Sequence, residues 1–199
     1  MGLALDYDHG QTPLDQDEID GLLISSVTTK RDLDEQEQLN IQSAFERYLF
    51  SKRIKSAQIL TVEFMLEVHR RMFDRVWSWA GEFRTTEKSI GITWTQIPVS
   101  LRILIDDCGY WIDHQVYLPE EIAIRFKHRL VSIHLFSNGN GRHSRLIADI
   151  LMKHVFQGSN FSWGQRNFTN KTLARKNYIH ALKQADLGNY EPLIKFALS

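Results

Sequence analysis

The pattern of apolar and polar residues along the chain predicts a mainly helical protein. Apolar side chains recur every three or four positions through residues 28–52 and again through residues 61–77, which is the spacing of one face of an α-helix. Thr29 lies at the start of the first of these stretches and can cap a helix there. The expected buried stripes consist of Leu39, Ile41, Phe45, Leu49 and Phe50 in the first helix and of Phe64, Leu66, Val68, Met72, Phe73 and Val76 in the second.

Further helical patterns follow in the second half of the chain. Pro119 is well placed in the first turn of the helix that follows it. Residues 81–98 differ, because they are rich in Thr and Ile, contain Gly91 and end at Pro98. This composition predicts a short β-hairpin, or flap, within an otherwise helical fold. The other predicted helices cover residues 99–115, 120–136, 144–156, 170–186 and 190–198.

Residues 1–30 differ in composition from the rest of the chain. They are acidic and contain glycine and proline, which predicts an extended arm with one short helix near residues 16–23. The remaining residues show no internal repeat and no low-complexity linker. A chain of 199 residues suffices for one ordinary domain with a single core. We therefore expect an N-terminal arm (1–30) followed by one helical domain (31–199).

The charge balance narrows the classes of function. The chain has 24 Lys and Arg against 24 Asp and Glu, so non-specific binding to nucleic acid or to a membrane surface is not expected. No apolar run is long enough to cross a bilayer, and the single cysteine, Cys108, excludes an intramolecular disulfide. The eight histidines lack the spacing of a zinc site. These features predict a cytosolic protein without a membrane anchor.

One segment, SIHLFSNGNGRHSRLIADILM (132–152), combines features that suit phosphate binding. Gly139 and Gly141 lie between two predicted helices, where the first amides of the second helix have no acceptor inside it and the helix dipole attracts anions. Glycine also lets the backbone approach a bound anion closely. Arg142 and Arg145 project from one side of that first turn, so each can contact a phosphate.

His134 precedes these glycines in the chain. A neutral imidazole beside a bound nucleotide can accept a proton from an incoming hydroxyl group. Simpler explanations stay open at this point: the glycines can serve a plain turn, the arginines a solvated surface, and the histidine the core. The combination within one short segment favours a polyphosphate site with a general base.

The same segment resembles the signature of the Fic (Fic/Doc) family, H-P-F-x-[D/E]-G-N-[G/K]-R-x-x-R. Upstream, WAGEFRTT and SIGITWTQIP are similar to the lead-in and target-docking flap of that family. Together with TPLDQDEIDGLL and TTKRDLDEQEQLNI, nearly the whole chain resembles the subgroup called mobile mystery protein B. The resemblance implies a Fic-type helical bundle. The stretch HLFSNGNGRHSR matches the signature at His134, Phe136, Gly139, Asn140, Gly141, Arg142 and Arg145.

The resemblance also implies an activity. Fic proteins typically transfer AMP, or another nucleoside monophosphate, from a nucleoside triphosphate to a Ser, Thr or Tyr hydroxyl of a target protein. By this resemblance His134 activates that hydroxyl and Phe136 anchors the loop in the core. A flap around Ile90, Gly91 and Ile92 would hold the target segment by strand addition. The groups expected to hold the phosphates are Gly139, Asn140, Gly141, Arg142 and Arg145.

Two positions depart from the family signature. Leu135 replaces a proline, which loosens the backbone but keeps an apolar side chain. Asn138 replaces the acidic residue that helps to hold Mg²⁺ against the phosphates, and an amide oxygen brings no charge to the metal. We therefore expect ATP or another nucleoside triphosphate together with a weakly held Mg²⁺.

Regulation is a further expectation. Many Fic proteins carry an inhibitory helix with the motif [S/T]-x-x-x-E-[G/N], and neither terminal part of this chain matches it, because Ser43 and Glu46 have the wrong spacing. The charged run KRDLDEQEQ (30–38) is expected to be a solvated helix face. Either a small separate protein acts as an antitoxin, or the chain is unregulated.

Two other functions stay open from the sequence. In the first, the Asn138 change silences transfer, and the fold only binds nucleotide or a partner. In the second, residues 134–151 form a helix, a turn and a DNA-recognition helix, although the neutral net charge argues against nucleic acid as a partner. Covalent labelling of protein by nucleotide distinguishes the enzyme from the binding module.

Overall fold

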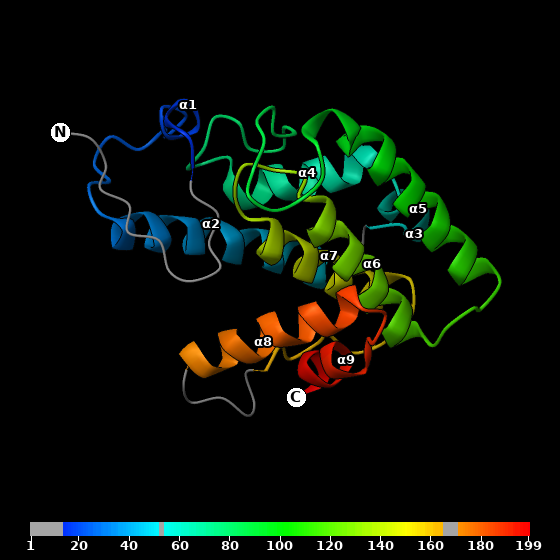
Figure 1. Cartoon of the computed structure of the whole chain (residues 1–199). Coiled ribbons are helices and arrows are strands. Elements are labelled where there is room, and N and C mark those ends of the chain that lie inside the picture. Colours follow the sequence, from blue (N-terminus) through cyan, green and yellow to red (C-terminus); the bar gives the residue numbers. More distant parts are fainter. Residues whose placement is uncertain (1–13, 52–53, 165–170) are drawn as a thin grey trace.

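The computed structural model describes residues 14–51, 54–164 and 171–199. Within these ranges the chain forms α-helices, one 3-10 helix and one isolated β-bridge, so the prediction of a mainly α fold is confirmed (Figure 1). The helices are α1 (Gln16–Ile19), α2 (Lys30–Phe50), α3 (Ser56–Ile59), α4 (Val62–Phe73), η1 (Trp94–Gln96), α5 (Ile97–Asp113), α6 (Pro119–Ile133), α7 (Asn140–His154), α8 (Lys171–Asp186) and α9 (Glu191–Leu198).

Side chains at the helix starts explain where α2, α4 and α6 begin. The Thr29 hydroxyl accepts a hydrogen bond from the Asp32 amide (3.2 Å), and the Asp32 carboxylate accepts one from the Thr29 amide (3.0 Å), which confirms the predicted cap of α2. Thr61 caps α4 by accepting from the Phe64 amide at 3.1 Å. Pro119 occupies the first turn of α6, where its missing N–H costs no helical hydrogen bond.

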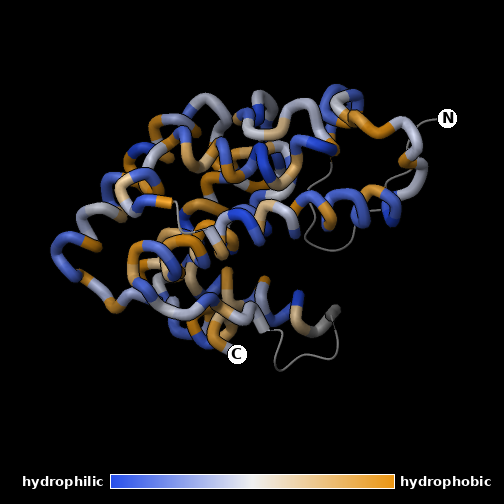
Figure 2. The backbone as a smooth tube through the Cα atoms, turned by 180° about the vertical axis from the view of Figure 1, so that it is seen from behind, coloured by the Kyte–Doolittle hydropathy of each residue, from blue (hydrophilic) through white to orange (hydrophobic). Residues whose placement is uncertain are grey.

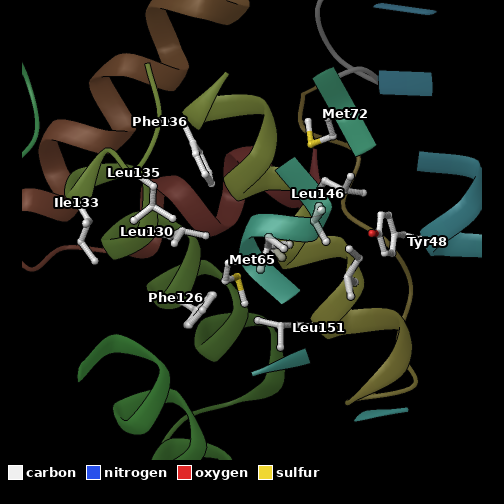
Figure 3. Close-up of a cluster of buried hydrophobic side chains, with 14 of the residues drawn as sticks. Tyr48, Met65, Met72, Phe126, Leu130, Ile133, Leu135, Phe136, Leu146 and Leu151 are labelled. Carbon is white, nitrogen blue, oxygen red and sulfur yellow. The ribbon is translucent and has the colours of Figure 1, made fainter. Parts of the chain in front are cut away.

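Helix α7 lies at the centre of the fold. It packs against α6, α2 and α4, while α8 and α9 form a pair that contacts α6 through α9 (Figure 1). Figure 2 shows that most helices carry both apolar and polar residues, as surface helices do. In α7, by contrast, Leu146, Ile147, Ile150 and Leu151 are at most 4% exposed. Figure 3 shows Leu146 and Leu151 within the buried cluster, so the helix that follows the glycines is anchored in the core.

The buried face of α2 differs from the predicted stripe, because two polar residues occupy part of it. The side chain of Asn40 donates to the Arg71 carbonyl (3.0 Å) and accepts from the Arg75 amide (3.0 Å), both near the end of α4. Glu37 is also buried. In a sequence pattern, a buried polar residue looks like a surface residue. The pattern therefore assigns the buried face of α2 to the wrong positions. The exposed members of the predicted stripe are Leu39, Phe45 and Phe50.

The predicted β-hairpin is wrong. In the described structure, residues 82–93, called the flap segment from here on, form bends and irregular backbone that lead into η1 and α5. Its amides bond to the end of α6 and the loop after it: the Arg84 amide donates to the Leu135 carbonyl (2.9 Å), and the Ile92 amide donates to the Ile133 carbonyl (3.5 Å). A Thr- and Ile-rich composition favours extended backbone but does not specify which segment it pairs with.

The described N-terminal residues lie against the flap segment. Lys88 donates hydrogen bonds to the carboxylates of Asp15 (2.8 Å) and Glu18. The one-turn helix α1 falls where the sequence predicts a short helix, and the part of the predicted arm before residue 14 lies outside the described residues. The boundary at residue 30 stays a prediction. None of the helices in the described ranges is long and apolar enough to cross a membrane.

Candidate functional site

A cavity of about 570 Å³ opens beside the start of α7. Its walls come from the first turns of α2, the loop between α6 and α7, and α8. The structure therefore brings most of the residues singled out in the sequence together around one cavity, while Phe136 lies in the core beneath it. Those on the cavity wall are Ile90, His134, Asn138, Gly139, Asn140, Gly141, Arg142 and Arg145.

Two residues in the left-handed region shape the loop before α7. His134 ends α6 with φ 60° and ψ 66°, and Gly139 precedes α7 with φ 80°. A Cβ atom at Gly139 would lie 2.4 Å from the Phe73 ring, so glycine is required there for both its backbone and its packing. A Cβ atom at Gly141 would meet nothing within 4 Å, which leaves that side of the first turn of α7 open.

Two side chains brace this loop from inside. The Asn140 side chain accepts from the Phe136 amide (2.9 Å) and donates to the Phe136 carbonyl (2.6 Å), so only its backbone amide is left to face a ligand. His69 of α4 accepts from the Gly81 amide at Nδ1 (3.0 Å) and donates from Nε2 to the Asn138 carbonyl (3.1 Å). His69 is fully buried, and nothing in the sequence pattern distinguishes it from an ordinary core residue. Its role in supporting the loop was therefore not predicted from the sequence.

Phe136 is fully buried and holds the loop against α4. Its ring stacks on the His69 ring with 3.6 Å between centroids and packs edge-on against the His143 ring at 5.0 Å. Leu135, which stands at the proline position of the signature, is also fully buried. Figure 3 shows both side chains among the core residues. The loop therefore rests on a packed aromatic base, with its polar atoms on the cavity side.

The imidazole of His134 lacks a hydrogen-bond partner among the described residues. The His134 side chain is 5% exposed, and neither ring nitrogen forms a hydrogen bond of normal geometry within the described part of the chain. Burial, followed by the positive charges of Arg84 and Lys88, lowers the pKa of His134 to about 4, although the nearby Val131 carbonyl acts in the opposite direction. The imidazole is therefore neutral at pH 7 and has a free lone pair for a substrate proton.

The start of α7 presents an anion-binding surface to the cavity. The first hydrogen bond of this helix runs from the His143 amide to the Gly139 carbonyl (2.9 Å), so the amides of residues 140–142 have no acceptor inside the helix. The Arg145 guanidinium lies 5.5 Å from the centre of the Tyr178 ring. Amides, helix dipole and Arg145 together suit phosphate oxygens.

Arg142 differs from Arg145, because a carboxylate of α2 already binds it. Its Nη1 lies 2.5 Å from Oε2 of Glu37. The other oxygen of Glu37 accepts from Trp77 Nε1 (2.7 Å) and from Asn138 Nδ2 (2.9 Å). Glu37 is fully buried, so this network joins α2 to the loop before α7 at the cavity wall. In this arrangement the charge of Arg142 is largely neutralised.

The interpretation of residues 30–38 as a solvated face is wrong for Glu37. Its neighbours Arg31, Asp34 and Glu35 are exposed as expected. Helical spacing could have indicated that Glu37 is buried, because Glu37 lies four residues after the buried Leu33 and therefore on the same face of the helix. A carboxylate on that face needs a buried partner, and its partner lies more than a hundred residues further along the chain.

The described side chains around Asn138 fit Mg²⁺ poorly. Oδ1 of Asn138 accepts from the Gly139 amide (2.7 Å) and from Arg142 (3.4 Å). The neighbouring carboxylate, Glu37, is likewise occupied by three donors. Magnesium usually binds one or two carboxylates as well as phosphate oxygens, and here both candidate ligands already have hydrogen-bond donors. The described residues also contain no group of three or more His, Cys, Asp or Glu that could hold a metal ion.

Fold and site together define a helical protein with a buried histidine beside an anion-binding helix start. Residues 59–152 match the model of the Fic/DOC family. The protein adenylyltransferase Fic of Nematostella vectensis is 28% identical over 176 residues, which cover 86% of this chain and 39% of that protein. The protein of the same name from Aedes aegypti is 26% identical over 83% of this chain and 32% of its own length. The chain thus spans well under half of the length of these relatives.

Solved structures show the same fold. Fic-1 from C. elegans has a TM-score of 0.68 and 22% identity, covering 90% of this chain and 51% of that chain. The BepC protein from Bartonella tribocorum, solved with bound AMPPNP, has a TM-score of 0.65 and 17% identity, covering 92% of this chain and 96% of that chain. The fold is therefore mainly α and of the Fic type, in agreement with the match of residues 59–152 to the Fic/DOC family model.

Proposed function

We propose that this chain is a Fic-type nucleotidyltransferase that moves AMP, or another nucleoside monophosphate, from a nucleoside triphosphate to a Ser, Thr or Tyr hydroxyl of a target protein. The observation that carries the proposal is that one cavity holds both the start of α7, with its free amides, and a buried imidazole that no described residue bonds. Within the family, the similar segments upstream of the signature favour the mobile mystery protein B subgroup.

His134 is the general base of the proposed reaction. Its neutral imidazole accepts the proton of the target hydroxyl while the hydroxyl oxygen attacks the α-phosphorus. A bond forms between that oxygen and the phosphorus, the bond to the oxygen that bridges to the β-phosphate breaks, and pyrophosphate leaves. The amides of residues 140–142 and Arg145 would neutralise charge on the phosphate oxygens, and Arg142 would do so once Glu37 releases it.

Target docking is proposed at the flap segment. Ile90 is 51% exposed and lies on the cavity wall, and Gly91 packs directly against His134. A target chain that lies along Ile90, Gly91 and Ile92 would bring its hydroxyl close to the imidazole. The amide and the carbonyl of Ile92 are already bonded to the Ile133 carbonyl and to Arg84, so an extended peptide would pair with the backbone of Ile90 and Gly91.

The comparisons support a nucleotide as the donor. The curated relatives are named protein adenylyltransferases. Among the similar solved structures, one from Bartonella tribocorum has bound AMPPNP and one from Bartonella quintana has bound ADP. Adenine nucleotides are therefore the first donors to test, followed by GTP, UTP and CTP.

The test is a transfer assay with α-labelled nucleotide, cell lysate and three proteins: the parent, His134→Ala and His114→Ala. His114 is exposed and remote from the cavity lining, so its variant is the matched control. Label that becomes covalent on protein with the parent and His114→Ala, but not with His134→Ala, supports the proposal. Equal labelling by all three proteins would reject His134 as the base.

A binding module is the second candidate function, and the pairing of Arg142 with Glu37 favours it. A chain that binds nucleotide measurably but transfers none of the four would belong to this class. Toxin activity, a small separate antitoxin and a cytosolic location remain predictions. The intramolecular contact between Glu37 and Arg142 offers a way to restrain the site without a separate protein.

A further inference from the structure

Arg84 of the flap segment is a buried cation bonded to backbone carbonyls. Its exposed fraction is 2%. The guanidinium donates from Nε to the His134 carbonyl (2.7 Å), from Nη1 to the Thr86 carbonyl (2.7 Å) and from Nη2 to the Ile92 carbonyl. No carboxylate within the described ranges forms an ion pair with it. These three hydrogen bonds satisfy the buried guanidinium, and in turn they hold the backbone of the three acceptor residues in place.

One of these acceptors is the backbone of the proposed base. His134 has φ 60° and ψ 66°, a conformation that is costly for a residue with a Cβ atom. The His134 amide contributes little to holding this conformation, because its hydrogen bond to the Leu130 carbonyl is long, at 3.4 Å. The charge-assisted bond from Arg84 to its carbonyl is short and buried. Arg84 therefore supplies the strongest described contact that favours this backbone conformation.

Arg84 also joins the flap segment to the loop before α7. Its amide donates to the Leu135 carbonyl (2.9 Å), so one residue bonds two successive carbonyls of that loop. On the opposite side, a Cβ atom at Gly91 would lie 2.5 Å from the Cβ of His134 and 3.0 Å from Nη2 of Arg84. The flap segment thus encloses His134 with Arg84 and Gly91, and neither ring nitrogen has a partner in the described part of the chain.

We propose that Arg84 is a positioning residue for the transfer reaction, because its guanidinium holds His134 in the left-handed conformation that places the imidazole at the cavity. The inference rests on the proposed function, in which His134 receives the proton. Three carbonyls in different directions require the planar fork of a guanidinium, which a lysine ammonium cannot reproduce. Arg84→Lys therefore keeps the buried charge but loses the geometry.

The kinetic test compares Arg84→Lys with Arg102→Lys, a matched change at an exposed arginine of α5. Arg84→Lys should lower kcat about 100-fold, the effect expected from misplacing a reacting group by about 1 Å. KM for the nucleotide should stay within about twofold, because the phosphate groups bind at α7. An unchanged kcat, or a higher KM with the parent kcat, would overturn the proposal.

Chemical rescue adds a result that general loss of packing would not produce. In Arg84→Ala, millimolar methylguanidine should restore part of kcat by occupying the vacated space, whereas methylamine at the same concentration should not. If methylguanidine and methylamine restored kcat equally, the positioning effect could not be assigned to the guanidinium fork, and the proposal would be overturned. Urea denaturation of each variant shows whether the loss of kcat comes from unfolding.

A spectroscopic test separates this inference from the proposed function. Backbone chemical shifts of His134 should report a left-handed conformation in the parent and should change in Arg84→Lys, while those of Gly141 stay the same. Unchanged His134 shifts overturn the inference whether or not the parent transfers nucleotide. A parent that transfers nothing, but whose His134 shifts depend on Arg84, rejects the proposed function and leaves the positioning role standing.

The parent protein alone decides the matter if Arg84→Lys does not fold. The Nε–H proton of Arg84 should exchange with solvent at least 100-fold more slowly than that of Arg102, because its acceptor is a buried carbonyl. Equal exchange rates at the two arginines would overturn the proposal.

Discussion

The cavity beside α7 has two unlike sides. On the α2 side, Glu37 binds both Arg142 and Asn138, so the carboxylate and the guanidinium neutralise each other. On the α8 side, Arg145 and Tyr178 line the cavity, and the Arg145 guanidinium lies 5.5 Å from the centre of the Tyr178 ring. The fully buried Lys127 does not line the cavity, but it lies 4.5 Å from the centre of the same ring and donates to the Tyr178 hydroxyl. Neither basic side chain forms an ion pair with a carboxylate of the described residues.

The difference indicates where a bound anion would be favoured. Burial, and then the charge of Arg145, lowers the pKa of Lys127 well below its ordinary value. An anion beside the α8 side would offset this repulsion, whereas the α2 side is already neutral. Arg145 is therefore the arginine that is ready for a phosphate, and Arg142 becomes available only when Glu37 moves or is removed.

The largest expected difference between the two sides is in stability. Arg142→Ala leaves the buried carboxylate of Glu37 without its cation, which should cost about 3 kcal/mol of the free energy of unfolding. Arg145→Ala breaks no described ion pair and should cost less than about 1 kcal/mol. Urea denaturation measures both values. Adding Glu37→Gln to Arg142→Ala should recover most of the loss, and equal losses for the two arginine variants would contradict the comparison.

Removal of the buried amine of Lys127 should have the opposite sign, that is, it should stabilise the fold. Lys127→Met replaces a fully buried amine with an apolar side chain of similar length and should stabilise the fold by about 2 kcal/mol at pH 7. The folded-state pKa of Lys127 lies below the unfolded value, so protonation favours the unfolded chain. The gain should therefore be present at pH 7 and shrink as the pH rises through about 10, where the unfolded amine also loses its proton.

Thermal unfolding at pH 7 and pH 10 measures this gain. Lys153→Met is the control, because Lys153 is exposed on α7, and it should change stability little at either pH. A loss of stability in Lys127→Met at pH 7 would mean that the bond to the Tyr178 hydroxyl outweighs the cost of burying the amine.

Releasing Arg142 should sharpen the comparison through nucleotide affinity. Glu37→Gln removes the charge that holds Arg142 but keeps an oxygen for Trp77 Nε1. The Kd for ATP should fall about tenfold, equivalent to about 1.4 kcal/mol, because both arginines can then bind phosphate. Calorimetry measures the affinity, and Glu35→Gln on the exposed face of α2 is the control. An unchanged Kd would assign Glu37 to the fold alone.

The smallest expected effect concerns magnesium. Asn138→Asp places a second carboxylate 2.9 Å from Glu37, where the amide nitrogen now donates. Two adjacent carboxylates repel each other unless a cation lies between them, so Mg²⁺ should raise ATP affinity about threefold more in the variant than in the parent. Titrations with Mg²⁺ and with EDTA measure the difference. An identical magnesium response in both proteins would argue against the metal role of this position.

The two sides also differ in how far the sequence predicts them. The signature residues of the loop are contiguous, and both arginines follow from helical spacing within one turn of α7. The restraint on Arg142 does not, because Glu37 lies 105 residues away and looks in sequence like one more charge on a solvated helix. The flap segment likewise depends on distant partners, since its composition predicts extended backbone but not its hydrogen bonds to the end of α6.

The sequence by itself determined most of the helices, the Thr29 cap of α2 and the glycine-containing loop before α7, because these depend on residues within a few positions of one another. Only the tertiary structure decided which polar side chains are buried and what they hold. Three buried contacts join residues that are 105, 69 and 50 positions apart: Glu37 with Arg142, His69 with the Asn138 carbonyl and Arg84 with the His134 carbonyl. A buried polar group is stable only beside its partner, and no local pattern records a partner that folding brings from so far away.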